Sequence, residues 1–124
     1  MINKKSYKVT KISDRALANT DIKSAAIGAN VQSIGKKAFY NCRKLTKITI
    51  PSKINKIGSQ AFGNCKKLKL ITVKTTKLTS KNMGKNAFKG IQAKAKIKVP
   101  KKKLKTYQKL FKARGVGKKV KFTK

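Results

Sequence analysis

The chain has 124 residues, of which 35 are Lys or Arg and 2 are acids, so that its formal net charge is +33. It contains no His, and its two acids are Asp14 and Asp21. This composition excludes imidazole bases and imidazole metal ligands, and it argues against cages of several carboxylates. A catalytic carboxylate pair would have to be built from the two aspartates. We therefore expect one domain that is not an enzyme and that holds no cofactor or metal.

The positive charge is carried by 32 Lys and by Arg15, Arg43 and Arg114. Arg reads guanine edges and phosphates with two parallel hydrogen bonds, whereas Lys acts as a point charge. The excess of Lys favours attraction to polyanions in general over recognition of one nucleic-acid sequence. A lysine bias of an AT-rich genome, spread over a solvated surface, is an equal alternative.

Residues 1–7 are basic, but no apolar segment follows them, so they do not predict a secretion signal. No apolar run approaches the roughly 18 residues that span a membrane. A cytoplasmic protein and a piece of a longer exported chain both fit these observations.

A repeated unit organises the chain. The unit that begins at Ile34-Gly35 recurs 23 residues later at Ile57-Gly58 and 26 residues after that at Met83-Gly84, which implies an insertion within residues 74–80. A degenerate copy starts at Ile12. Because such a short unit cannot bury enough apolar surface alone, neighbouring units must stack. The repeat predicts an α/β solenoid of about four 23-residue units over residues 1–99, the first of them degenerate. The recurring positions are Ala38-Phe39, Asn41-Cys42, Leu45, Ile48 and Ile50 in one unit and Ala61-Phe62, Asn64-Cys65, Leu68, Ile71 and Val73 in the next.

Each unit divides into two parts. The alternation that ends at Ile48 and Ile50 predicts a strand with one buried face, and stacking such strands gives a parallel sheet. Gly35 permits a close approach or an unusual backbone conformation, and residues 36–41 after it are expected to form a short helix or a second strand. Phe39 and its equivalents are expected to form an internal ladder.

One unit reads Ile57-Gly58-x-x-Ala61-Phe62-x-x-Cys65-x-x-Leu68-x-x-Ile71-x-Val73, and Pro51 follows the strand of the unit before it. This pattern resembles the BspA-like, or treponemal-type, leucine-rich repeat. The chain departs from it at Lys74, where the pattern has proline, and at Gly90-Ile91, where it has Asn-Cys. The resemblance implies a leucine-rich-repeat solenoid that acts as an interaction module of a bacterial surface or secreted protein, with a role in adhesion.

The C-terminal segment is expected to close the stack. Leu104, Tyr107 and Leu110 recur on one face of a helix predicted over residues 101–112, and Gly115 fits its end. The alternation from Val120 to Phe122 suggests a short edge strand. We interpret residues 100–124 as a helical C-terminal cap within the same domain. The alternative is a basic amphipathic helix that lies on an anionic membrane or polymer.

Cys42 and Cys65 occupy equivalent positions and are expected to be neighbours in the core. Strand spacing brings their Cα atoms within the range of a disulfide, although parallel stacking usually holds the Cβ atoms too far apart. The chain has no further Cys or His to complete a zinc site and no His partner for a catalytic thiol.

The exposed positions of the stacked strands form a continuous surface, which is where repeat proteins commonly bind. Its outward columns are Ser24, Lys47, Leu70 and Lys96, and Ala26, Thr49, Thr72 and Lys98. From these, the predicted binding surface is Lys47, Thr49, Leu70, Thr72, Lys96 and Lys98. The partner is expected to be a protein, a glycan or an anionic cell-wall or extracellular polymer, and nonspecific binding of nucleic acid through Lys is the alternative.

Overall fold

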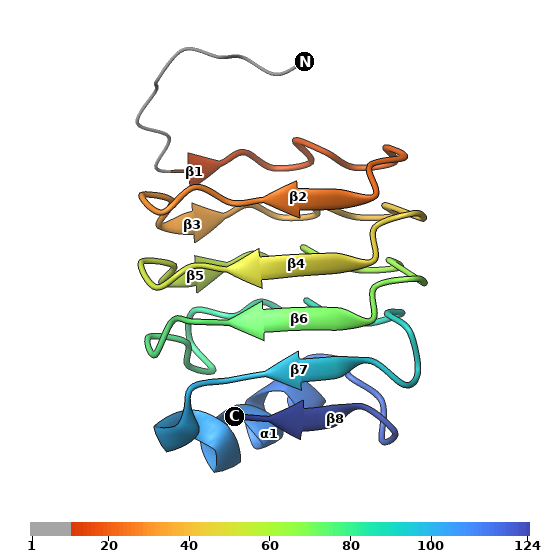
Figure 1. The fold of residues 1–124 in the computed structure, drawn as a ribbon. Helices are drawn as coiled ribbons and strands as arrows, with labels where there is room; N and C mark the ends of the chain where they lie inside the picture. The colour runs from red at the N-terminus through yellow and green to blue at the C-terminus, as the bar shows by residue number, and fades with distance from the viewer. Residues whose placement is uncertain (1–10) are drawn as a thin grey trace.

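Figure 1 shows a computed structural model of the protein, which describes residues 11–124. Residues 1–10 lie outside the described part, and with them the start of the repeat region expected over residues 1–99 and the segment considered above as a secretion signal. In chain order the elements are β1 (Lys11–Ile12), β2 (Ser24–Ala26), β3 (Ser33–Ile34), β4 (Lys47–Ile50), β5 (Lys56–Ile57), β6 (Leu70–Val73), β7 (Lys96–Lys98), a 3-10 helix (Lys101–Lys103), α1 (Leu104–Ala113) and β8 (Lys121–Thr123).

The strands form two parallel sheets. One has the order β1-β3-β5 and the other β2-β4-β6-β7-β8, and Figure 1 shows the five strands of the second sheet stacked one below another. Lys47 pairs with Leu70, and Leu70 pairs with Lys96. These pairings reproduce the 23- and 26-residue spacings of the sequence, so the stacked parallel strands and the insertion are confirmed.

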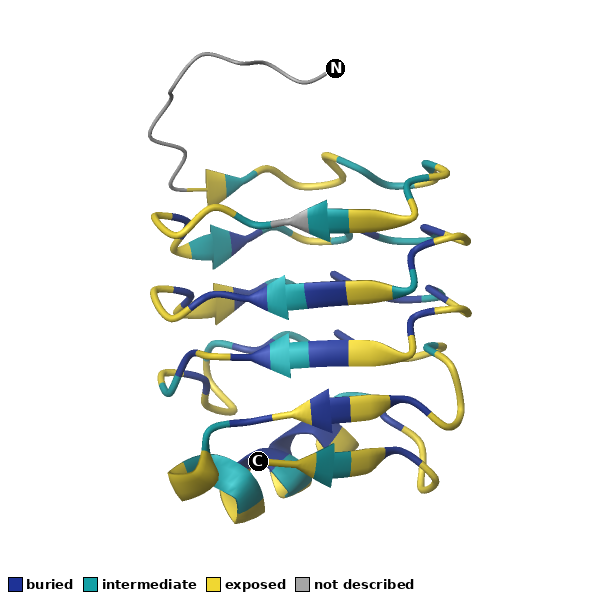
Figure 2. Ribbon diagram, in the orientation of Figure 1, coloured by how far each residue is buried: buried dark blue, intermediate teal, exposed yellow. Residues whose placement is uncertain are grey.

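Alternation along the strands builds the core. Ile48, Ile71 and Ile97 are register partners in β4, β6 and β7, and each is at most 2% exposed. Successive side chains of a strand point to opposite faces, so the residues on either side of these isoleucines point outwards. Figure 2 shows buried residues next to more exposed ones along β4, β6 and β7.

A column of stacked phenylalanines fills the interior. The ring centroids of Phe39 and Phe62 lie 4.9 Å apart, and those of Phe62 and Phe88 lie 5.1 Å apart, with nearly parallel rings. The predicted ladder is therefore confirmed. Phe111 of α1 continues it at 5.0 Å from Phe88, which the repeat pattern did not indicate.

Residues 36–41 form turns, so the expectation of a short helix or second strand there is wrong. Lys37 and Asn41 have φ angles of 56° and 58°, and left-handed residues at this spacing interrupt a helix. The Phe39 N–H instead donates to the Ala61 carbonyl of the next repeat at 2.7 Å, while alternate N–H groups bond within the same turn. The strands of the smaller sheet, β1, β3 and β5, lie just before these turns and their equivalents in the other repeats.

Gly35, Gly58 and Gly84 let the backbones of neighbouring repeats meet. The Gly58 N–H donates to the Ile34 carbonyl at 2.8 Å, and a Cβ atom on Gly58 would lie 2.5 Å from the backbone nitrogen of Lys36. Gly58 does not have a positive φ angle, so the requirement is for space. The close approach expected from the sequence is confirmed.

The C-terminal helix packs on the last repeat. Tyr107, Leu110 and Phe111 are buried, at most 8% exposed, and β8 pairs in parallel with β7 at the edge of the larger sheet. The predicted helix and edge strand are therefore confirmed. The apolar face of α1 is covered, so it is not available for the membrane contact considered above. No helix in residues 11–124 has the length and apolar character of a membrane span.

Tyr107 of α1 forms hydrogen bonds with the insertion after β6. The Tyr107 hydroxyl donates to the Thr75 carbonyl at 2.8 Å and accepts from the Leu78 N–H at 3.2 Å. Thr75 is itself buried, and its hydroxyl donates to the Ile54 carbonyl at 2.6 Å. Burial raises the pKa of Tyr107, so the folded protein favours the neutral phenol.

We expect Gly58→Ala to lower the free energy of unfolding by roughly 1–3 kcal/mol, because the new methyl group meets backbone that has no room to move. Gly117→Ala is the matched control, since no atom lies within 4 Å of its added Cβ, and its effect is expected to stay below about 1 kcal/mol. Urea unfolding of both variants measures the difference. Equal stability of the two would show that the repeats are not in contact at Gly58.

We expect Tyr107→Phe to cost about 1–3 kcal/mol, because it leaves the buried Leu78 N–H without its partner and removes the bond to the Thr75 carbonyl. Tyr40→Phe is the control, since the half-buried Tyr40 hydroxyl has no hydrogen-bond partner within the described residues. Thermal unfolding of the two variants checks this. A Tyr40→Phe variant that is the less stable of the two would contradict it.

The stabilisation by Tyr107 is also expected to depend on pH. Because its pKa is raised in the folded protein, its contribution is complete below the unfolded pKa of about 10 and is lost as the pH rises towards the folded pKa. The gap in unfolding free energy between wild type and Tyr107→Phe should therefore shrink at alkaline pH. Urea unfolding of both proteins at about pH 8 and pH 11 measures this gap. Both proteins contain the same lysines, so the effect of lysine titration cancels in the difference. A gap that widens would contradict the assignment.

Candidate functional site

The outward residues of the larger sheet form two rows that run across the strands. Strand register sets each row, so its members are backbone neighbours about 4.8 Å apart. All six residues of the predicted binding surface lie in these rows. We call the two rows the strand face: the first consists of Ser24, Lys47, Leu70, Lys96 and Lys121, and the second of Thr49, Thr72, Lys98 and Thr123.

The β2–β4–β6 end of the strand face is mixed in character. Leu70 is 43% exposed, and it lines a hollow of about 290 Å³ together with Lys47, Thr49 and Thr72. An apolar side chain surrounded by hydroxyl groups and one ammonium group suits a contact with a protein or a neutral polymer. Of the residues that line this hollow, Lys47 alone is charged.

The β7–β8 end is strongly basic. Lys96 and Lys121 are register partners there, and they face a hollow of about 640 Å³. Of the lysines around this hollow, only Lys96 was predicted from the sequence, because the parallel pairing of β8 with β7 is not visible in the pattern of β8 alone. The lining residues are Lys94, Lys96, Lys118, Lys119, Val120 and Lys121.

Both carboxylates of the chain are engaged at the opposite end of the stack. The Asp14 carboxylate accepts a hydrogen bond from the Lys36 backbone N–H at 2.9 Å. Asp21 lies 3.6 Å from the Arg43 guanidinium in an exposed ion pair, which contributes little to stability. Residues 22–124 contain no acid, so no carboxylate belongs to β4, β6, β7 or β8.

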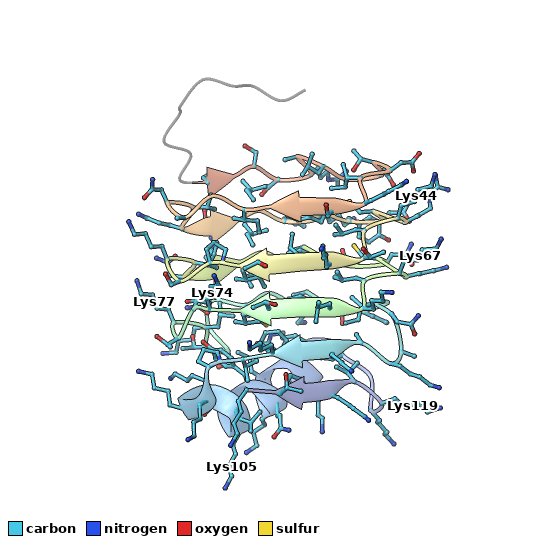
Figure 3. The ribbon with its side chains drawn as sticks, viewed as in Figure 1. Lys44, Lys67, Lys74, Lys77, Lys105 and Lys119 are labelled. Atoms are coloured by element: carbon cyan, nitrogen blue, oxygen red, sulfur yellow. The ribbon has the colours of Figure 1, made fainter. Side chains whose placement is uncertain are left out.

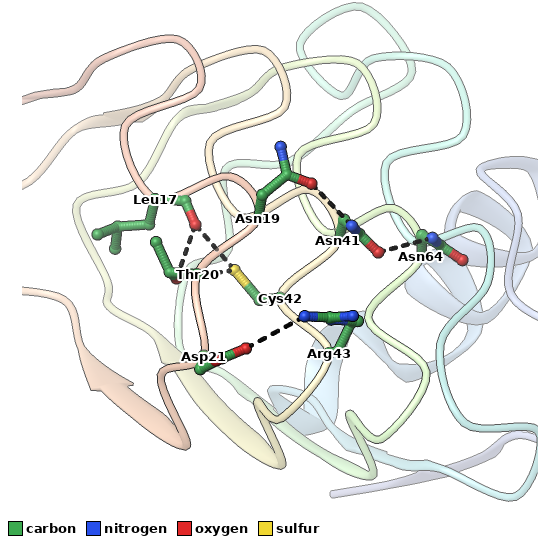
Figure 4. A network of polar contacts seen from close by, with 8 residues as sticks. All are labelled: Leu17, Asn19, Thr20, Asp21, Asn41, Cys42, Arg43 and Asn64. Atoms are coloured by element: carbon green, nitrogen blue, oxygen red, sulfur yellow. Dashed lines mark hydrogen bonds and ion pairs between the residues drawn. The ribbon is translucent and has the colours of Figure 1, made fainter.

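Asparagine side chains join neighbouring repeats at one corner (Figure 4). Asn41 donates to Asn19 at 2.7 Å, and Asn64 donates to Asn41 at 2.9 Å. All three have φ angles near 60°, a conformation that Asn tolerates better than most residues. Gly90, the equivalent residue of the next repeat, has a φ angle of 90°, which glycine adopts without a steric penalty.

The two thiols are packing groups. Cys42 donates to the Leu17 carbonyl at 3.1 Å and Cys65 to the Phe39 carbonyl at 3.0 Å, and both residues are buried and free (Figure 4 draws Cys42). The neighbouring Cys42 side chain and burial raise the pKa of the Cys65 thiol. The hydrogen bond with the Cys65 side chain lowers the pKa of Cys42. The chain has no His that could act as the base of a catalytic cysteine. The prediction that both cysteines are core residues is confirmed.

Within residues 11–124, no cluster of three or more His, Cys, Asp or Glu side chains is suited to hold a metal ion. The repeated feature of the exposed surface is the pair of rows of the strand face, in which equivalent side chains lie at the spacing of the strands. Such rows suit contact with an extended partner.

Comparison with known proteins agrees with the repeat seen in the sequence. Residues 5–123 match the family model described as "BspA type Leucine rich repeat region (6 copies)". The match extends through α1 and β8, which therefore lie within the repeat region of the family model. No match was found among curated proteins or among solved structures. Since the family model covers nearly the whole chain, the protein belongs to the BspA-type leucine-rich repeat family.

Proposed function

We propose that this chain is a non-enzymatic binding module of a surface or secreted bacterial protein. In this proposal residues 1–99 form a solenoid of about four repeats, and residues 100–124 form its cap within the same domain. The family is typical of surface proteins that bind through their repeats. Packing of Phe111 on Phe88 and the pairing of β8 with β7 support a role of the C-terminal segment in covering the last repeat.

The partner that we propose is an anionic polymer of the cell wall or the extracellular space. The observation that carries this proposal is the strand face, whose lysines stand in register while no carboxylate follows Asp21 in the chain. Lysines neutralise phosphates or other anions and release their counterions. Lys47, Lys96 and Lys98 would contact the polymer, and Thr49, Thr72 and Leu70 would contribute uncharged contacts.

A protein or glycan partner is the second candidate. The exposed Leu70 and the hollow beside it favour this alternative at the β2–β4–β6 end. In the cytoplasm, the same charge would bind nucleic acid without sequence preference. The strand face has no aromatic residue on which bases or sugar rings stack, which favours a polymer recognised through its charges.

We expect the wild-type protein to bind poly(glycerol phosphate), heparin and duplex DNA in low salt, and to retain poly(glycerol phosphate) at a salt concentration that releases the other two. Titrations across a salt series, with circular dichroism as a check of folding at each salt, measure this. If the folded protein bound none of the three polyanions at low salt, the proposal would be contradicted, and the protein or glycan partner would remain as the candidate.

The strand-face lysines are tested by substitution. Lys47, Lys96 and Lys98 changed together to Gln are expected to make the slope of log affinity against log salt shallower by about 2, because three ionic contacts are lost. The matched control changes the exposed Lys36, Lys56 and Lys85 to Gln. Lys56 lies in β5, and Lys36 lies two residues after the end of β3. Lys85 lies two residues after Met83, which pairs with Ile57 of β5. An equal change of slope in both variants would mean that the charge acts without a defined surface.

A further inference from the structure

Four turns of the same kind are stacked at one side of the larger sheet. Each is closed by an N–H that donates to the carbonyl three residues earlier, and each lies just before a strand. The four bonds are Leu45 to Cys42 at 3.2 Å, Leu68 to Cys65 at 3.0 Å, Ala95 to Gln92 at 3.1 Å and Val120 to Gly117 at 3.3 Å. The turns precede β4, β6, β7 and β8, which are consecutive neighbours in the sheet.

The central residues of these turns are exposed and, with one exception, basic. We call them the turn ridge. Figure 3 labels three of its lysines, Lys44, Lys67 and Lys119, on one side of the stack, with Lys74 and Lys77 on the opposite side. The turn ridge consists of Arg43 and Lys44, Lys66 and Lys67, Ala93 and Lys94, and Lys118 and Lys119.

Backbone hydrogen bonds fix the spacing of the ridge. Directly after the turns, the Lys69 N–H donates to the Thr46 carbonyl at 3.0 Å, the Lys96 N–H to the Lys69 carbonyl at 2.8 Å, and the Lys121 N–H to the Ala95 carbonyl at 3.0 Å. Neighbouring turns are therefore separated by about one strand spacing, roughly 4.8 Å. One lysine from each turn occupies the equivalent position, and the backbones of these four residues form a line of about 14 Å along the stack. The four are Lys44, Lys67, Lys94 and Lys119.

The charges of this line are unneutralised by the protein. The one described ion pair of the ridge joins Arg43 to Asp21, and the next three turns belong to a part of the chain without acids. Two ammonium groups that came as close as the backbone spacing would repel each other even in water, by about 1 kcal/mol before salt screening. A ligand with anions at a similar spacing removes this repulsion as it binds.

We propose that the turn ridge binds a linear, acyclic phosphodiester polymer that lies along the stack, with successive phosphates opposite successive turns. This inference rests on the proposed binding of an anionic polymer and names its site and direction. The ridge meets the strand face at the basic hollow, which Lys94, Lys118 and Lys119 line from the ridge and Lys96 and Lys121 from the strand face. The polymer therefore follows the edge at which the two surfaces join.

The chemistry of the ridge selects the backbone of the polymer. Seven of its eight residues are basic and none is aromatic, so it has no platform for the rings of sugars or bases. Six of the seven are Lys, which binds phosphate as a point charge and does not need the planar fit that Arg makes with carboxylates. A flexible chain of phosphates without rings matches these properties.

The decisive experiment compares two variants of equal charge. The ridge variant changes Lys44, Lys67, Lys94 and Lys119 to Gln, and the control variant changes the exposed Lys74, Lys77, Lys101 and Lys105 to Gln. For poly(glycerol phosphate) in about 0.1 M salt, we expect the ridge variant to bind about tenfold more weakly or worse, with a salt slope shallower by about 3. The control variant is expected to lose less than about threefold. Circular dichroism of both variants is the check that they are folded.

The outcomes separate the two proposals. If wild type binds and both variants weaken equally, the ridge is overturned while polymer binding stands; if wild type does not bind, the proposed function itself fails. If the ridge variant loses duplex DNA or heparin as strongly as poly(glycerol phosphate), the assignment to an acyclic phosphodiester is overturned. For wild type, affinity per oligomer should rise steeply with poly(glycerol phosphate) length until four turns are covered and then level off. A steady rise beyond that length would contradict a ridge of this size.

Discussion

The fold depends on how closely one repeat approaches the next. Strand pairing requires a separation of about 4.8 Å, and the turns between the strands must reach the same separation without a sheet to guide them. Gly35, Gly58 and Gly84 make this possible, because a Cβ atom at any of them would lie 2.6 Å or less from the backbone of the preceding repeat. The alternating hydrogen bonds after these glycines then satisfy each turn partly from within and partly from its neighbour.

The same separation is imposed on every side chain. Inside the stack it sets the phenylalanine rings at 4.9 to 5.1 Å, where aromatic contact is favourable. Outside, it brings equivalent lysines together at a distance where they repel one another. Stacking therefore places the same type of exposed side chain next to its equivalents in neighbouring repeats. A lysine at such a position forms, with its equivalents in four repeats, a row of positive charges.

The sequence predicted the periodic part of this structure and much less of its ends. The hydrophobic positions and glycines of the units at Ile34 and Ile57 are sufficient to predict the parallel strands, the inward ladder and the columns of the strand face. The turns at residues 36–41 were mistaken for a helix or strand. Of their two left-handed residues, Asn41 is a type that favours this conformation but Lys37 is not, so the sequence did not mark the first interruption of a helix.

The C-terminal end shows a different limit. The apolar spacing around Leu110 predicts a helix, but it does not reveal that Phe111 takes the place of a repeat phenylalanine or that β8 adds Lys121 to the strand face. These features depend on tertiary register, which a single pass through the sequence does not contain. Of the basic hollow, only Lys96 was therefore part of the predicted surface, and the turn ridge was missing from it altogether.

The unfolded chain carries the same +33 charge as the folded protein, so a polyanion is attracted to both. Binding to the unfolded state subtracts from any stabilisation by the ligand. A polyanion that recognised charge alone would leave the free energy of unfolding nearly unchanged or lower it. What folding adds is alignment, since only the stacked repeats place Lys44, Lys67, Lys94 and Lys119 in one line. The extent to which a polymer stabilises the fold therefore measures how much of its affinity comes from the geometry of the stack and how much from charge.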